Sequence, residues 1–395
     1  MTYLKKEENL ISGQLITSAE CFGVNCLTLT NYRNYSHLRI KLTDDPVIVT
    51  GPNGSGKTNL LEALSLFAPG RGFRHAKLSH LARAQGDGGW GVNAKIATPQ
   101  GQVTIGTGYS LPKIKGSRDS RIVQIDNAKK VSQNSLPAYV NVIWLTPQMD
   151  GIFNGPPSER RSFFDRLVSS WDPLHQGRIN SFKTKMRERL FLLAKSTKPD
   201  FTWISSLENS LTDQGIAIAA ARLDFLSRID SIASKGLNSF PGVNLSLVGD
   251  LEHRLQDSPA IKVEDWFRES LKKNRALDLE AGKTILGPHR TDLKVFHIPK
   301  KQTAELCSTG EQKALLVGII LAHARLKKIG TGFAPLLLLD EIAAHLDEGK
   351  RQALFDNLNE LGGQIWFTGT DTNLFKVPFN SVQMLKVDNG IVTHS

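Results

Sequence analysis

The chain has 395 residues, of which 40% are hydrophobic, so it is long enough to build more than one lobe around a packed core. Lysine and arginine outnumber aspartate and glutamate by 49 to 38, giving a formal net charge of +11. Such a surface attracts polyanions, which favours a nucleic-acid partner without selecting duplex or single strands. Many soluble proteins are equally basic without one, so charge alone leaves both interpretations open.

Two classes of protein are disfavoured by the sequence. No apolar run approaches the roughly 20 residues of a membrane span, and the polar residues 5–8 do not fit the apolar segment of a signal peptide. We therefore expect a cytoplasmic protein without a membrane partner. The cysteines Cys21, Cys26 and Cys307 have no paired ligand spacing, so neither a disulfide framework nor a zinc site is expected.

Residues 51–58 fit the spacing G-x-x-x-x-G-K-[ST] at every fixed position, and two alternating strands over 26–42 precede them. An apolar run leads into the motif and a helix-forming segment leads out, which argues against an ordinary glycine-rich turn. Backbone N–H groups and the helix N-terminus would cradle the phosphates of ATP. Lys57 is expected to reach the β- and γ-phosphates, and the Thr58 hydroxyl to ligate Mg²⁺. The predicted cradle consists of Gly51, Pro52, Asn53, Gly54, Ser55, Gly56, Lys57 and Thr58.

Basic residues follow this motif in two places. Residues 70–74 contain Arg71 and Arg74, which either meet phosphate or DNA or are solvated. Residues 90–131 predict short antiparallel strands. The loop between them is a candidate DNA-contacting edge and nearly as readily a solvated basic loop; its basic residues are Lys113, Lys115, Arg118 and Arg121.

Helical periodicity dominates beyond residue 155. Apolar residues recur every three or four positions over 179–193 and 207–232, which predicts two long antiparallel helices. An alternating strand over 243–247 and an amphipathic helix over 263–279 follow. The chain lacks the uninterrupted heptads of an extended coiled coil, so we expect a compact arm.

A second set of acidic and polar residues completes the predicted ATP site. Four leucines at 336–339 precede Asp340 and Glu341, which is typical of a central parallel strand ending in a Walker B pair. Asp340 is expected to hold Mg²⁺ through water, and Glu341 to orient or deprotonate the attacking water. Another buried strand at 140–145 ends near Gln148, whose side chain can reach a bound metal. The predicted metal ligands are Thr58, Gln148 and Asp340, and the predicted catalytic residues are Lys57 and Glu341.

Ser308 and Gly310 lie directly before a helical run and form a candidate second anion site. Ordinary N-capping of a helix would use the same residues. Glu311 follows them, and a carboxylate near a phosphate is unfavourable unless it points away.

The order of these motifs resembles the ABC-type ATPase heads of DNA repair and chromosome maintenance. Gly51 and Ser308 lie 257 positions apart, which is more than in transporter subunits and fewer than in the chromosome-condensing SMC proteins. This intermediate insertion resembles the RecF family. The local strings that carry the resemblance are 31–35, 51–63, 70–74, 160–165 and 287–292.

The resemblance implies an α/β fold: an ABC-ATPase-like P-loop head, with a mixed sheet and antiparallel hairpins, and an inserted, mainly helical arm. The expected divisions are the N-terminal part of the head over 1–155, the arm over 156–282 and the C-terminal part of the head over 283–395.

The resemblance also implies an ATP-dependent DNA-binding protein of recombinational repair, replication restart and the SOS response to DNA damage. It would bind duplex DNA and single-strand/duplex junctions, dimerise around two ATP molecules and act with RecO and RecR. The residues expected to act in cis are Lys57, Thr58, Gln148, Asp340 and Glu341; Ser308 and Gly310 would act in trans. Thr370 occupies the position of the switch histidine of transporters, so hydrolysis should be slow and weak.

Alternative functions remain open from sequence: the ATPase subunit of a membrane transporter, or a nucleotide-locked scaffold with little turnover. Residues 287–290 are interpreted either as a hinge between arm and head or as a contact with nucleotide or DNA. The sequence gives no reason to assign His289 a catalytic role.

Overall fold

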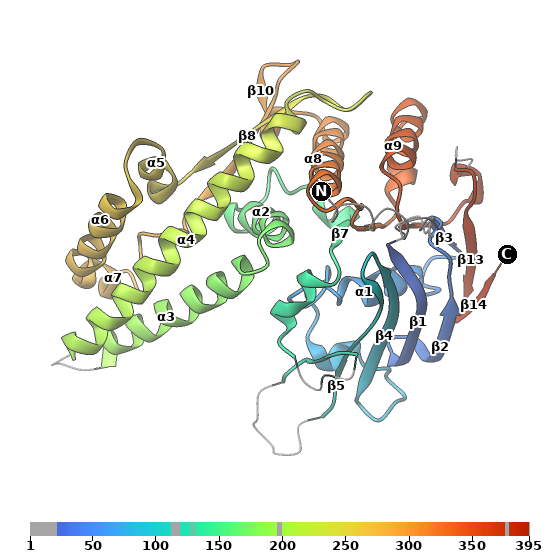
Figure 1. The fold of residues 1–395 in the computed structure, drawn as a ribbon, viewed down its shortest axis with the longest axis horizontal. Coiled ribbons are helices and arrows are strands. Elements are labelled where there is room, and N and C mark those ends of the chain that lie inside the picture. Colours follow the sequence, from blue (N-terminus) through green and yellow to red (C-terminus); the bar gives the residue numbers. More distant parts are fainter. Residues whose placement is uncertain are drawn as a thin grey trace, which may run out of the picture.

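The computed structural model describes residues 22–111, 119–126, 128, 131–195, 200–375 and 379–394. Figure 1 shows two regions, one built from stacked sheets and helices and one from a projecting group of helices. We call the first region the head: the two larger sheets with the helices α1 (Lys57–Ser65), α8 (Thr309–Thr331) and α9 (Glu348–Leu361). The second, the arm, comprises the helices between residues 157 and 280 and a small sheet. Of the helices in the described ranges, none combines the length and apolar character that a bilayer crossing requires.

The centre of the head is a six-stranded sheet with the order β14-β13-β3-β12-β11-β7. All neighbouring pairs run parallel except β13 and β14, which form an antiparallel edge. The strands are β3 (Val47–Thr50), β7 (Val142–Leu145), β11 (Leu336–Leu339), β12 (Ile365–Gly369), β13 (Gln383–Asp388) and β14 (Ile391–His394). The predicted mixed sheet is therefore confirmed.

Helices cover both faces of this sheet, which explains why its inner strands are continuously apolar. Leu336 and Leu338 belong to a hydrophobic cluster that includes α1 and the second sheet. Leu337 and Leu339 point the other way, into a cluster that includes α8 and α9. The helices are α1 (Lys57–Ser65), α8 (Thr309–Thr331) and α9 (Glu348–Leu361).

The second sheet of the head is antiparallel, with the order β2-β1-β4-β5-β6, and confirms the predicted hairpins. Its strands are β1 (Gly23–Tyr32), β2 (Tyr35–Lys41), β4 (Trp90–Thr98), β5 (Gly101–Tyr109) and β6 (Ile122–Ile125). Lys113, Lys115 and Arg118 lie outside the described residues. Arg121 donates hydrogen bonds to the carbonyl oxygens of Gly70 and Ala68 at 2.6 and 3.2 Å, so its guanidinium contacts the segment that follows α1.

The arm contains the two long helices that the periodicity predicts, α3 and α4, which pack side by side (Figure 1). Its helices are α2 (Pro157–Trp171), α3 (His175–Lys195), α4 (Phe201–Ala233), α5 (Asp250–Asp257), α6 (Ala260–Lys273) and α7 (Arg275–Glu280). Its small sheet has the order β10-β9-β8, formed by β8 (Val243–Val248), β9 (Asp292–His297) and β10 (Gln302–Thr303). The strand β8 lies before the predicted boundary between arm and head at residue 282, and β9 lies after it. Because these two strands pair, one sheet contains residues from both predicted segments, and the boundary stays a prediction.

The single helix predicted over 263–279 is wrong in one respect, because Asn274 separates α6 from α7. Phe267 and Leu271 lie in the hydrophobic cluster of the arm. Beyond the break, Leu277 and Leu279 are 53% and 44% exposed, so the apolar stripe does not continue along one buried face.

A buried ion network joins four elements of the arm. Arg222 on α4 donates two hydrogen bonds to the Asp165 carboxylate of α2, at 2.8 and 2.9 Å. It also donates to Glu252 of α5 at 3.1 Å and to the carbonyl oxygen of Pro288 at 2.7 Å. Although burial alone would raise it, the pKa of Asp165 lies well below its usual range because of Arg222 and His175. Residues 287–292 are therefore anchored to the arm through Arg222.

His323 lies fully buried on α8, with Nε2 2.6 Å from the hydroxyl of Ser170 on α2. Burial lowers the pKa of His323 to about 3.

The neutral state of His323 predicts a specific pH dependence of stability. The unfolded chain protonates this ring near pH 6.5, so it binds more protons than the folded chain as the pH falls. His323 should therefore cost the folded state about 2 kcal/mol of stability between pH 7 and pH 5. Urea unfolding at pH 7 and pH 5 measures this loss in the free energy of unfolding. In the His323→Gln variant the loss should be smaller by about 2 kcal/mol. An equal loss in both proteins would contradict a neutral buried histidine.

Candidate nucleotide-binding site

The loop between β3 and α1 has the backbone conformation that its glycines permit. Gly51 and Gly56 adopt φ values of 147° and 118°, which side chains with a Cβ rarely reach. A Cβ on Gly51 would lie 2.1 Å from the carbonyl oxygen of Val387, and one on Gly56 would lie 2.4 Å from Asn34 Nδ2. Both fixed glycines are thus required by the packing of the loop itself.

The turn between β1 and β2 supports the phosphate loop through hydrogen bonds to its backbone. Asn34 Nδ2 donates to the carbonyl oxygen of Ser55 at 2.9 Å, and the Tyr35 hydroxyl donates to that of Gly56 at 3.0 Å. Asn34 Oδ1 accepts a hydrogen bond from Asn59 of α1 at 2.9 Å. Sequence reasoning noted residues 31–35 as a family string but missed this supporting role, because the contacts span about 20 residues.

Lys57 is buried within the loop. Its ammonium donates to the carbonyl oxygens of Gly51 and Pro52, at 2.8 and 2.9 Å. Burial lowers the pKa of Lys57, and the carboxylates of Glu341 and Asp340 oppose that shift. The cation therefore lies at the predicted cradle, close to the acidic pair of the Walker B strand.

Asp340 meets the loop at the carboxyl ends of the parallel strands, where open α/β sheets bind ligands. Its Oδ1 accepts hydrogen bonds from the hydroxyl of Thr58 at 3.0 Å and from that of Thr368 at 2.7 Å. Burial raises the pKa of Asp340, while these two hydroxyls favour its charged form. The sequence did not indicate the contact from Thr368, which lies in β12; Thr370, the residue at the predicted switch position, is exposed.

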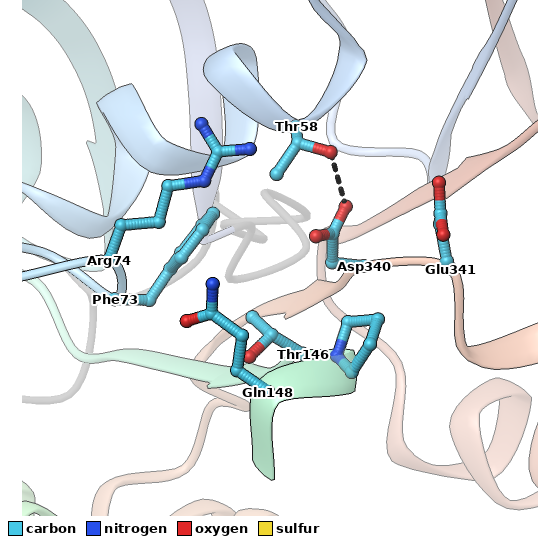
Figure 2. A pocket seen from close by; sticks show the side chains of 8 residues that line it. Thr58, Phe73, Arg74, Thr146, Gln148, Asp340 and Glu341 are labelled. Carbon is cyan, nitrogen blue, oxygen red and sulfur yellow. Dashed lines mark hydrogen bonds between the residues drawn. The ribbon is translucent and has the colours of Figure 1, made fainter. Parts of the chain in front are cut away.

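Thr58, Asp340 and Glu341 border a cavity of about 220 Å³ (Figure 2). Figure 2 shows the hydrogen bond that joins Thr58 to Asp340, with Arg74 and Phe73 to one side of this pair and Gln148 to another. The lining residues are Thr58, Phe73, Arg74, Thr146, Pro147, Gln148, Asp340 and Glu341. The structure therefore brings together residues from positions 58 to 341, including Gln148, in one site. Arg71 and Arg74 were both candidates to meet phosphate, and of these two Arg74 lines the cavity.

Glu341 has a left-handed backbone, with φ 52° and ψ 20°, which is uncommon for a residue other than glycine. Its N–H is held by a 2.9 Å hydrogen bond to the hydroxyl of Thr368. Strained backbones that surrounding contacts enforce occur preferentially at functional sites. Here the conformation places Glu341 at the cavity, directly after Asp340.

The donor set of the cavity fits Mg²⁺. A hydroxyl from Thr58, a carboxylate from Asp340 and the amide oxygen of Gln148 are the hard oxygen ligands that this ion takes. The buried carboxylate of Asp340 has only hydroxyl partners among the described residues. A divalent cation would compensate that negative charge.

Ser308 and Gly310 do not line this cavity and are exposed at the start of α8. Ser308 and Glu311 form a reciprocal capping box, in which Glu311 accepts the Ser308 N–H at 2.9 Å. An ion pair with Lys300 lowers the pKa of Glu311 to about 2. The Glu311 carboxylate, which would be unfavourable beside a phosphate, therefore binds the N-terminus of its own helix and pairs with the Lys300 ammonium.

His289 lies away from the cavity, in the arm. Its Nε2 is 2.8 Å from the carbonyl oxygen of Thr284, and its ring contacts that of Phe182 with centroids 5.8 Å apart. Burial lowers the pKa of His289. These contacts favour the hinge interpretation of residues 287–290 over a contact with nucleotide bound in the described cavity.

The sequence is similar to known proteins along most of its length. The RecF/RecN/SMC N terminal domain family matches residues 23–393. The DNA replication and repair protein RecF of Mesorhizobium japonicum is 48% identical over 373 residues, spanning 93% of this chain and 97% of that protein. The protein of the same name from Allorhizobium ampelinum is 45% identical over 374 residues, spanning 94% and 99%.

Solved structures share the fold. A solved structure of the recombination mediator protein RecF with ATP, in the RecFOR pathway, has a TM-score of 0.82 at 22% identity. The match covers 96% of this chain and 99% of that one. An Smc head domain from Pyrococcus furiosus has a TM-score of 0.53 at 16% identity, covering 94% and 95%. The predicted α/β fold of an ABC-type ATPase head is thereby confirmed.

Proposed function

The chain belongs to the RecF family, whose relatives are DNA replication and repair proteins, and from this membership we propose that it is an ATP-dependent DNA-binding switch. One observation carries the proposal: Thr58 of the phosphate loop lines a single cavity with Asp340 and Glu341, and its hydroxyl donates a hydrogen bond to Asp340. The RecF structure solved with ATP supports ATP as the nucleotide. The net charge of +11 supports DNA as the polyanion.

The charged and polar groups of the phosphate loop and the cavity have distinct roles in the proposed hydrolysis. Lys57 and the N–H groups of the loop bind the phosphates, and Arg74 adds a second cation. Thr58, Gln148 and Asp340 would hold Mg²⁺, which would compensate the charge that develops on the phosphates. Glu341 accepts a proton from the attacking water.

The proposal includes dimerisation, which gives the exposed candidate anion site at Ser308 and Gly310 a role. These two residues do not line the described cavity, so we assign them to the nucleotide of a second copy of the chain. Binding of two ATP molecules between two heads would stabilise the dimer on DNA, and slow hydrolysis would release it. Cytoplasmic action at duplex DNA and single-strand/duplex junctions, with RecO and RecR as partners, completes the proposal.

The ATPase rate tests this function against its alternatives. We expect duplex DNA to raise the rate several-fold and neutral lipid vesicles to leave it unchanged, because the basic surface binds the polyanion. Steady-state phosphate release measures both. Ser308→Arg should abolish the DNA stimulation while retaining ATP binding. Stimulation by vesicles alone would favour a transporter subunit, and no turnover under any condition would favour a nucleotide-locked scaffold.

A further inference from the structure

A buried carboxylate lies between two arginines at the edge of the nucleotide site. The Glu62 side chain is 0% exposed on α1, where an unpaired charge would be strongly unfavourable. Arg33, from the turn between β1 and β2, donates to both of its oxygens, at 2.8 and 2.7 Å. Arg74 donates to one of the same oxygens at the longer distance of 3.3 Å.

The two arginines therefore share Glu62 unequally. Arg33 forms the planar, two-bond pair that is the strongest arrangement of guanidinium and carboxylate. Arg74 has one weak contact with Glu62, and its orientation is fixed instead by a 2.9 Å hydrogen bond to Asn59 Oδ1. The trio carries two positive charges and one negative charge, so one net positive charge remains.

That remaining charge faces the nucleotide cavity. Arg74 lines the cavity together with Thr58 and Asp340 (Figure 2), whereas Arg33 does not. Asn59, which orients Arg74, donates to Asn34 of the same turn that carries Arg33. The turn at 31–35 thus contacts the phosphate loop through Asn34 and Tyr35, and reaches Arg74 through Glu62 and Asn59.

We propose that Arg33 is a positioning residue of the nucleotide site: by occupying the buried Glu62 carboxylate, it keeps the charge of Arg74 available to the phosphates of the bound nucleotide. Without Arg33, Glu62 would retain Arg74 as its one cationic partner among the residues that the structure describes, and the tighter pair would withdraw Arg74 from the cavity. The proposal rests on the proposed function, because it takes ATP as the ligand of this site.

The test measures ATP affinity in an Arg33 and Glu62 mutant cycle, with a fluorescent ATP analogue and Mg²⁺. Arg33→Met should raise the Kd by about tenfold, because one charge-assisted contact to phosphate is lost. Arg33→Met/Glu62→Gln should return the Kd to within about threefold of the parent, because the neutral amide no longer competes for Arg74. Arg33→Lys keeps the positive charge and should stay close to the parent.

The rescue separates positioning from structural support. If Arg33 only stabilised the fold, the double variant would bind no better than Arg33→Met, and that result would overturn the proposal. Should Arg33→Met fail to fold, Glu62→Gln alone remains informative: it should bind ATP at least as tightly as the parent, and a tenfold loss would overturn the proposal. Failure of the parent chain to bind ATP would instead refute the proposed function.

Discussion

Glu341→Gln should lower the rate of ATP hydrolysis by about 10²-fold or more while leaving the Kd for ATP within about threefold. Glutamine has the shape of glutamate but cannot accept the proton of the attacking water. The left-handed backbone at this position and its hydrogen bond to Thr368 do not depend on the side-chain charge, so the cavity should keep its form. Phosphate release in single-turnover reactions measures the chemical step directly.

Lys57→Ala is the control for this prediction, because it should abolish ATP binding rather than turnover of bound ATP. An unchanged single-turnover rate in Glu341→Gln would exclude Glu341 as the base. Retention of DNA-repair function in that variant would favour the scaffold interpretation, in which hydrolysis has no role.

Arg222→Met should lower the free energy of unfolding by about 3–5 kcal/mol, which is the usual cost of removing one partner from a buried ion pair. Asp165 would keep only its contact with His175 Nε2 among the ion-pair partners in the described residues, and Glu252 would lose a hydrogen bond. The carbonyl oxygen of Pro288 would also lose its donor, so the arm should loosen at residues 287–292. Urea unfolding monitored by circular dichroism provides the measurement.

The same helix offers a matched control. Arg228 pairs with Asp224 one turn away, and both side chains are about half exposed, at 48% and 51%. Exposed pairs of this kind contribute little, because water solvates the separated charges nearly as well. Arg228→Met should therefore unfold at the parent's urea concentration. Equal destabilisation by the two substitutions would mean that burial does not govern the Arg222 network.

Local pattern made the head predictable from sequence. The apolar runs before Gly51 and before Asp340 indicate parallel strands buried on both faces. The first strand leads into the phosphate loop, and the second ends directly before Asp340, which lines the cavity. Parallel strands with helical crossovers bring such ends to one edge of the sheet. The long helices of the arm were equally visible, because apolar residues repeat along α3 and α4 over many turns.

Contacts between distant segments were not predictable in this way. Nothing in the spacing of Arg33, Glu62 and Arg74 indicates that they share one buried carboxylate. Similarly, the ion pair that redirects Glu311 depends on Lys300, which lies in the turn between β9 and β10. The helix break at Asn274 was not predicted, because apolar residues continue beyond it at helical spacing in the sequence. In the structure Leu277 and Leu279 are exposed.

In the proposed function two copies of the chain share their ATP sites, and the solution mass of the Glu341→Gln variant tests this sharing most directly. Light scattering with ATP and Mg²⁺, with and without duplex DNA, should show a dimer. Adding Lys57→Ala or Ser308→Arg to this variant should return it to a monomer, because each removes one side of the shared site. A monomer under every condition, together with demonstrated ATP binding, would contradict the shared site and leave a monomeric nucleotide-gated DNA binder.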